Sequence, residues 1–394
     1  MSSAVRCATG LVEGDAGVDA FAEAAGRAAM GLGGAPCDIA LVFAGQDNLE
    51  YAVTGLGAVH ERLHPDALAG CGAQGVVGTG REIEAGGVVV WAASLGGGKA
   101  EAFHMEAIPA GEGRLAITGM PDLDGSEALV MLVDPYTFPA EALLSEIARS
   151  SPGVPVVGGL AAAERPVAAL FHDDDVSHMG AVGLVLSDVD VNCCVSQGAS
   201  PIGPEMVVTA ADGNVIYELA SRPALDRLMD AIAGELSPSD QALATQGLLV
   251  GIVIDENRPD YDRGDFLVRG LLSVDERERT ITIGERVRVG QTVRLHVRDA
   301  DSADEDLRVA LERAARGLGS DPAGALMFTC NGRGSNMFGS VGHDAGALAR
   351  EIGPAPAAGF FCAGEIGPVG SRSFVHGFST SVALFGAEPG HGPG

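Results

Sequence analysis

Two glycine-rich segments near the C-terminus each hold one charged side chain where an apolar run ends. Residues 330–336 (Cys-Asn-Gly-Arg-Gly-Ser-Asn) contain Arg333, and residues 362–368 (Cys-Ala-Gly-Glu-Ile-Gly-Pro) contain Glu365. Ligand sites in open α/β sheets lie at such strand ends, and glycine lets the backbone approach a bound group closely. We therefore expect both segments to be loops that lie side by side. Together, Arg333 and Glu365 could bind the carboxylate and the amino group of a zwitterion such as an amino acid.

A second interpretation is that Arg333 pairs with Glu365 and merely ties the two loops together. A similar glycine-rich loop at residues 72–84 contains the run Arg-Glu-Ile-Glu, which also fits a solvated or loop-pairing charge run. The candidate ligand-binding residues are Cys330, Asn331, Arg333, Gly364 and Glu365, with Gln74, Arg81 and Glu82 from the earlier loop.

Metal and nucleotide chemistry find little support in the sequence. The stretch 172–178, with two histidines and three aspartates, lies between strands and is typical of a solvated loop. Residues 332–335 do not form a phosphate-binding Walker loop, because no Gly-Lys-Ser/Thr follows them. We therefore expect no metal site and no cofactor.

The seven cysteines show no spacing typical of disulfides or zinc, since their number is odd and no CxxC pair occurs. We therefore expect reduced thiols and a cytoplasmic location. We expect neither a disulfide nor a zinc site. A nucleophilic Cys330 or Cys362 with His343 or His376 is conceivable. No dyad occurs at short spacing, which favours binding over catalysis.

The elements that position these residues follow a repeated order. Apolar periodicity and turn signals predict strand–helix–strand–strand at residues 38–95, 128–186 and 324–385, about 60 residues each. Duplication is a hypothesis, because identity among the three segments is low. The predicted fold class is α/β, with two domains of mixed sheet covered by helices. The predicted regions are a helical lead at 1–35, domains at 36–233 and 248–386, and a flexible tail at 387–394.

Composition limits the possible partners. The 394 residues are 46% hydrophobic and 20% charged, which is typical of globular domains. The formal charge of −28 argues against binding to nucleic acid and to anionic lipid. No apolar run reaches the roughly 18 residues of a transmembrane helix. The N-terminus lacks the apolar segment of a signal peptide.

Six short motifs in order give the chain a resemblance to a known family. They lie at residues 70–84, 196–204, 263–269, 290–299, 330–334 and 359–368. With these motifs the chain resembles the FIST family, the bacterial F-box and intracellular signal transduction sensory proteins, in both its N-terminal and C-terminal domains. The resemblance implies an intracellular sensory module that binds small ligands such as amino acids and could signal to a protein partner. It implies no catalytic residues. The alternatives are an enzyme of unknown reaction that uses a strand-end cysteine or Glu365, and a protein-interaction scaffold.

Overall fold

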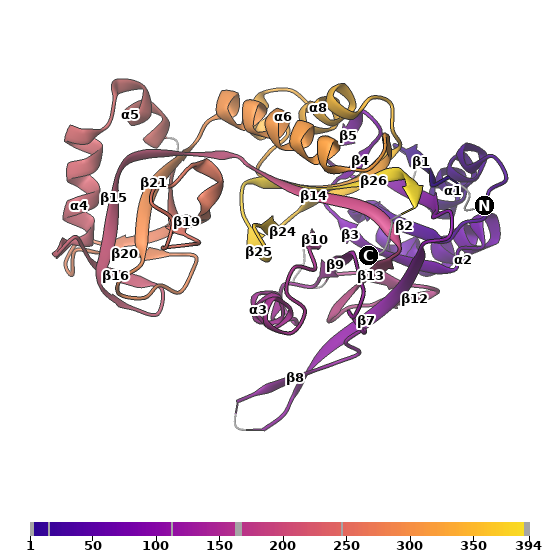
Figure 1. Ribbon diagram of the computed structural model, residues 1–394, viewed down its shortest axis with the longest axis horizontal. Helices are drawn as coiled ribbons and strands as arrows, with labels where there is room; N and C mark the ends of the chain where they lie inside the picture. Colours follow the sequence, from indigo (N-terminus) through magenta and orange to yellow (C-terminus); the bar gives the residue numbers. More distant parts are fainter. Residues whose placement is uncertain (1–3, 15, 112, 162–167, 246, 390–394) are drawn as a thin grey trace. The chain divides into compact units, whose positions relative to one another are not determined.

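The computed structural model describes residues 4–14, 16–111, 113–161, 168–245 and 247–389. It confirms an α/β fold with mixed sheets in two compact units (Figure 1). Unit 1 comprises residues 1–195, 307–375 and 380–394, and unit 2 comprises residues 196–306 and 376–379. Compactness thus groups the third predicted repeat with the first two. The sequence boundaries 36–233 and 248–386 stay a prediction.

Within the described residues, unit 1 contains three strand–helix–strand–strand repeats, as the sequence predicts. The first consists of β2 (Ile39–Gly45), η1 (Gln46–Tyr51), α2 (Ala52–Leu63), β3 (Ala67–Ala73), β4 (Val76–Gly78), β5 (Arg81–Ile83) and β6 (Val88–Ser94). The second consists of β9 (Ala128–Val133), α3 (Ala140–Ser150), β10 (Val156–Leu160), β11 (Leu170–His172), β12 (Asp175–Ser177) and β13 (Ala181–Ser187). The third consists of β22 (Pro322–Cys330), α7 (Ser335–Phe338), α8 (His343–Ile352), β23 (Ala357–Cys362), β24 (Gly364–Val369), β25 (Arg372–His376) and β26 (Ser379–Pro389).

The strands pair in the same way in every repeat. The first strand pairs parallel with the second and antiparallel with the last, as in β2 with β3 and β6. The same holds for β9 with β10 and β13, and for β22 with β23 and β26. In each sheet one more strand, which comes earlier in the chain than the repeat, pairs with the last strand of that repeat. These strands are β1 (Arg6–Val12), β7 (Lys99–Pro109) and β14 (Val189–Gln197).

Each repeat also donates a short hairpin to the sheet of another repeat. Hairpin β4–β5 pairs with β23, β11–β12 pairs with β3, and β24–β25 pairs with β10. A side chain of each hairpin accepts a hydrogen bond from a backbone N–H near the start of the receiving strand. These bonds are Ala357 N–H to Thr79 Oγ1 (3.0 Å), Leu68 N–H to Asp173 Oδ1 (3.2 Å) and Val156 N–H to Ser373 Oγ (2.9 Å). The cyclic exchange supports the hypothesis of duplication.

The sheets of unit 1 are buried on both faces, which explains their continuous apolar runs. Along β2, Leu41 and Phe43 face a core shared by the three repeats, whereas Ala40 and Val42 face helices. In the shared core the ring of Phe43 stacks on that of Phe360 with centroids 5.1 Å apart. The outer faces are covered by α1 (Val18–Leu32) and α2, by α3, and by α6 (Ala300–Gly317) and α8.

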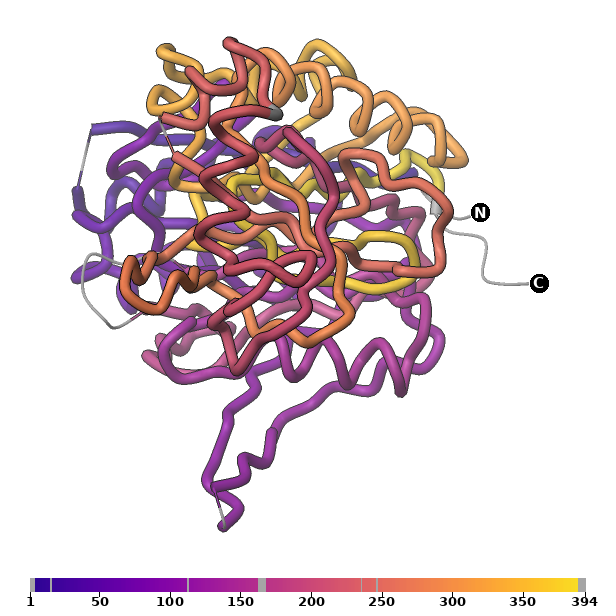
Figure 2. The backbone as a smooth tube through the Cα atoms, turned by 90° about the vertical axis from the view of Figure 1, so that its left-hand side faces the viewer, coloured from indigo at the N-terminus to yellow at the C-terminus, as the bar shows by residue number. Residues whose placement is uncertain are grey.

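Two further features of unit 1 concern its edges. Strand β7 forms a hairpin with β8 (Leu115–Thr118), and this hairpin extends beyond the sheet to which it belongs (Figures 1 and 2). Of the predicted tail at 387–394, residues 387–389 belong to β26, and the others lie outside the described residues. Among the residues that the structure describes, no helix is long and apolar enough to cross a membrane.

Unit 2 is mainly an antiparallel sheet with short helices. Its strands lie in the order β15-β21-β18-β19-β20-β16-β17, and a further pairing joins β15 to β16. Its apolar core lies between this sheet and the helices. The elements are β15 (Ala199–Asp212), β16 (Val215–Leu219), β17 (Arg222–Pro223), α4 (Ala224–Asp230), η2 (Ala231–Glu235), α5 (Pro238–Ala244), β18 (Leu248–Val253), η3 (Arg263–Asp265), β19 (Phe266–Asp275), β20 (Thr280–Ile283) and β21 (Thr292–Arg298).

Candidate ligand-binding site

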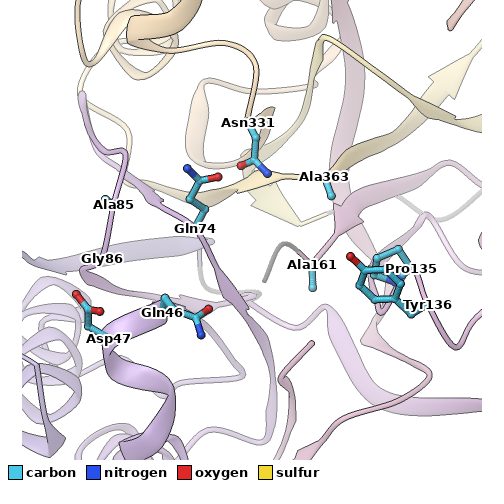
Figure 3. Close-up of a pocket in the computed structure, with 10 residues that line it drawn as sticks. All are labelled: Gln46, Asp47, Gln74, Ala85, Gly86, Pro135, Tyr136, Ala161, Asn331 and Ala363. Carbon is cyan, nitrogen blue, oxygen red and sulfur yellow. The ribbon is translucent and has the colours of Figure 1, made fainter. Parts of the chain in front are cut away.

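A cavity of about 410 Å³ lies where the parallel strand pairs of all three repeats end (Figure 3). Each pair contributes residues that follow its two strands, so the cavity occupies the position typical of ligand sites in α/β sheets. The lining residues are Gln46, Asp47, Gln74, Ala85 and Gly86 from the first repeat, Pro135, Tyr136 and Ala161 from the second, and Asn331 and Ala363 from the third.

Polar side chains around the cavity have unused hydrogen-bonding capacity. Gln46 Oε1 and Asn331 Oδ1 are both shielded from solvent and accept no hydrogen bond from the described residues. A shielded acceptor without a donor costs about 1–3 kcal/mol. The ring of Tyr136 lies across the same space, and this residue is 64% exposed (Figure 3). A group bound in the cavity could satisfy these atoms.

Glycine allows the backbone to form one wall of the cavity. A Cβ atom on Gly45 would lie 2.2 Å from the carbonyl carbon of Gly86, so only glycine permits this close approach. Gly86 has φ 76°, and its N–H donates to the carbonyl oxygen of Gln74 at 3.1 Å. A Cβ atom there would lie 3.8 Å from Asp47 Oδ2. The turn thus leaves the space beside the Asp47 carboxylate open.

The two glycine-rich segments lie side by side, as the sequence predicts. Strands β22 and β23 are parallel with Cys330 opposite Cys362, and Asn331 N–H donates to the Cys362 carbonyl oxygen at 2.9 Å. The expectation that residues 362–368 form a loop is wrong. Strand β24 begins at Gly364 and pairs with β10, because the third repeat donates this hairpin to the second.

Arg333 is fully buried, and its guanidinium is engaged within the protein. Its Nε and Nη2 atoms donate to the two carboxylate oxygens of Asp344 at 2.6 and 2.9 Å. Burial alone would raise the pKa of Asp344, but the charge of Arg333 and hydrogen bonds from His343, Arg333 and Thr329 hold that pKa well below its usual range. Asp344, which neither sequence interpretation named, therefore holds the guanidinium, and the nearby charge of Glu365 adds a smaller attraction. Direct ligand contact by Arg333 would require this pair to open.

Three other predicted residues lie close to lining residues in the chain but do not line the cavity themselves. Glu365 is 0% exposed and lies opposite Gly159, and Gly364 lies opposite Leu160 in the pairing of β24 with β10. Cys330 directly precedes the lining residue Asn331. Of the eight residues predicted to bind a ligand, only Asn331 and Gln74 line the cavity.

Arg81 and Glu82 lie in the hairpin that the first repeat donates to the third. Glu82 is 3% exposed and accepts hydrogen bonds from the N–H groups of Gly342 and Ala345, at 3.1 and 2.8 Å, at the start of α8. Burial, with the nearby charge of Asp344, raises the pKa of Glu82 to about 7. Arg81 is exposed and forms an ion pair with Glu13. Both side chains thus have structural partners.

The other residues that the sequence suggested for metal binding or catalysis have contacts within the fold or are buried thiols. In the 172–178 stretch Asp173 accepts from Leu68 N–H, and Asp174 lies 3.2 Å from His60, so these groups hold a hairpin in place. The seven cysteines are free thiols. Burial, with the nearby charge of Glu365, raises the pKa of the Cys362 thiol well above its ordinary value. Such a thiol is a poor nucleophile at neutral pH.

The lining residues that were not predicted from the sequence include Gln46, Asp47, Pro135 and Tyr136. They follow the first strands of the first and second repeats, as Asn331 follows the first strand of the third. Superposing the three predicted repeats would have pointed to them, because equivalent strand ends meet at a shared site.

The sequence matches the FIST N domain at residues 38–222 and the FIST C domain at residues 224–368. The chain therefore belongs to the FIST family, whose domains are associated with sensory signal transduction. It is similar to an uncharacterized protein of Mycobacterium tuberculosis, with 45% identity over 370 residues that cover 93% of this chain and 96% of the relative. An uncharacterized protein of Mycobacterium bovis is 44% identical over 370 residues, which cover 93% of this chain and 95% of that protein.

Proposed function

We propose that the chain is a cytoplasmic sensory module that binds a small polar ligand in the cavity between its three repeats. The observation that carries the proposal is that each repeat contributes lining residues from its strand ends, and that shielded oxygen atoms there receive no hydrogen bond from the described residues. A cavity of about 410 Å³ suits a small metabolite. Amino acids remain the ligand class implied by the family, and a protein partner would receive the signal.

The arrangement suggests how binding is converted into a signal. A ligand that contacts all three repeats contributes binding energy only when their strand ends are correctly placed. Binding therefore favours the arrangement of unit 1 in which the cavity is complete, at the expense of other conformations. In this scheme Asn331 and Gln74 contact the ligand, while Cys330, Arg333, Gly364 and Glu365 maintain the strand ends beside it. Arg81 and Glu82 hold the donated hairpin.

The rival enzyme hypothesis receives less support from these surroundings. A strand-end thiol would have to ionise to act as a nucleophile, whereas burial raises the pKa of Cys362. Binding requires no such ionisation, and the unsatisfied side-chain oxygens of Gln46 and Asn331 suit it directly.

A thermal-shift screen with amino acids and related small metabolites tests the proposal, because a ligand that binds only the folded state raises its apparent stability. We expect at least one compound to raise the melting temperature in a concentration-dependent manner. Asn331→Ala should weaken its binding at least about tenfold, or roughly 1.4 kcal/mol. The matched control is Asn336→Ala, because Asn336 is exposed and lies outside the cavity lining. Equal effects of the two substitutions would contradict this site.

A further inference from the structure

We infer that the cavity binds a cationic amine. An amine without a carboxylate should bind better than the amino acid that has the same amine chain and a carboxylate. This inference rests on the proposed function, and for the same site it favours amines without a carboxylate over the amino acids that the family implies. It follows from the charge of the lining, the unsatisfied oxygen atoms and the aromatic ring that surround the space (Figure 3).

The charge of the lining has one sign. Among the ten described residues that line the cavity, Asp47 is the one with a carboxylate, and none is lysine, arginine or histidine. The Asp47 carboxylate is exposed and forms no hydrogen bond or ion pair with another residue in the described part of the chain. It is thus available to an ammonium group, which would gain a charge-assisted hydrogen bond.

The other features of the lining are also rich in electrons. Gln46 Oε1 and Asn331 Oδ1 lack donors from the described residues, and an ammonium group supplies up to three donors. The ring of Tyr136 is largely exposed and contacts no other aromatic ring or cation among the described residues. Cations bind above such a ring within about 6 Å of its centroid. Three kinds of acceptor therefore favour the same class of ligand.

A carboxylate has fewer partners at this site. Arg333 follows the lining residue Asn331 by two positions, but it is absent from the lining. Its guanidinium is held by Asp344 in a two-pronged ion pair. The chain carries a formal charge of −28, which repels anions and attracts cations at long range. Adding a carboxylate to an amine therefore introduces repulsion by Asp47 without a compensating cation.

Four molecules with a common four-carbon chain separate these contributions. They are 1,4-diaminobutane, its carboxylated form ornithine, the zwitterion 4-aminobutanoate and the neutral butane-1,4-diol. Binding of each to the full chain is measured by isothermal titration calorimetry at pH 7.5 and constant ionic strength, since salt screens non-specific attraction. We expect 1,4-diaminobutane to bind at least tenfold more tightly than ornithine, 4-aminobutanoate or the diol.

Two charge-neutralising variants then locate the binding. Asp47→Asn should weaken the binding of 1,4-diaminobutane at least tenfold. The matched control is Glu50→Gln in the same short helix, because Glu50 is exposed and lies outside the lining. This control removes the same charge and should change the affinity less than twofold. Equal losses in both variants would mean general electrostatic attraction and would overturn the inference.

The wild-type ranking decides the matter even if a variant fails to fold. Absence of 1,4-diaminobutane binding, or equal or tighter binding of either carboxylated compound or the diol, overturns the amine inference. If a carboxylated compound or the diol binds as tightly or more tightly, the proposed function still stands. If 1,4-diaminobutane does not bind at all, the proposed function stands only if another metabolite in the broader screen binds through Asn331. If no metabolite binds, both fail.

Discussion

Glu82→Gln should remove a pH-dependent loss of stability from unit 1. Glu82 comes from the hairpin of the first repeat, yet its buried carboxylate accepts hydrogen bonds at the start of α8 in the third. Burial and the nearby charge of Asp344 raise its pKa from 4.5 to about 7. The folded state therefore holds this proton more tightly than the unfolded state does.

The sign and size of the effect follow from this difference. A raised folded-state pKa gives stability that is fully present below pH 4.5 and is lost as the pH rises through about 7. One pKa unit corresponds to about 1.4 kcal/mol, so the change amounts to about 3 kcal/mol over that window. The glutamine amide stays neutral and its oxygen can accept one of the two hydrogen bonds, so the loss of the other lowers stability equally at every pH. The stability of wild type minus that of Glu82→Gln should thus fall by about 3 kcal/mol between pH 4.5 and pH 8.

Urea unfolding followed by tryptophan fluorescence measures this difference. Trp91 is the single tryptophan of the chain and is buried in β6, so its signal reports on unit 1. Other titrating groups are shared by the two proteins and cancel in the comparison. The control Glu61→Gln lies on the exposed face of α2 and should follow the wild-type profile. A stability difference between wild type and Glu82→Gln that is constant with pH would refute the reasoning.

Three further predictions concern other parts of the chain. Arg333→Met should lower the free energy of unfolding by about 3–5 kcal/mol, because it leaves the buried Asp344 carboxylate without its cation; urea unfolding checks this, and unchanged stability with lost ligand binding would instead make Arg333 a ligand contact. Burial lowers the pKa of His296 in unit 2 to about 4 from 6.5, so the stability of unit 2 should fall as the pH drops through this window. Hydrogen exchange of β18 and β21 should show this loss, and His296→Gln should reduce it. Thiol titration under denaturing conditions without a reductant should find all seven cysteines reactive, and a stable shortfall would contradict the free thiols.

The repeats could be predicted from the sequence because their strands are buried on both faces and form continuous apolar runs. Their order also predicted that residues 330–336 and 362–368 meet, since consecutive strands joined by a helix pair in parallel. The hairpin exchange could not be predicted in this way. Strands β4 and β5 have three residues each, and their pairing with β23 depends on tertiary contacts that local periodicity does not contain.

The predicted site residues also differ from those that line the cavity, because the burial of a side chain cannot be read from the sequence. Arg333 and Glu365 were singled out as charged residues in glycine-rich segments, but both are shielded within the protein. Asp344, which pairs with Arg333, lies 11 residues further on, in helix α8. The cavity instead draws on Gln46 and Tyr136, whose types are unremarkable until the strand ends are brought together. Charge and glycine content pointed to segments next to the cavity, and only tertiary packing identified which side chains face it.

A crystal structure grown with the most stabilising compound of the thermal-shift screen would show whether the cavity between the repeats is the ligand site. We expect the compound to occupy the cavity and to contact all three repeats, through Gln46, Tyr136 and Asn331. A compound bound in unit 2, or on unit 1 away from these residues while the cavity holds only water, would contradict it.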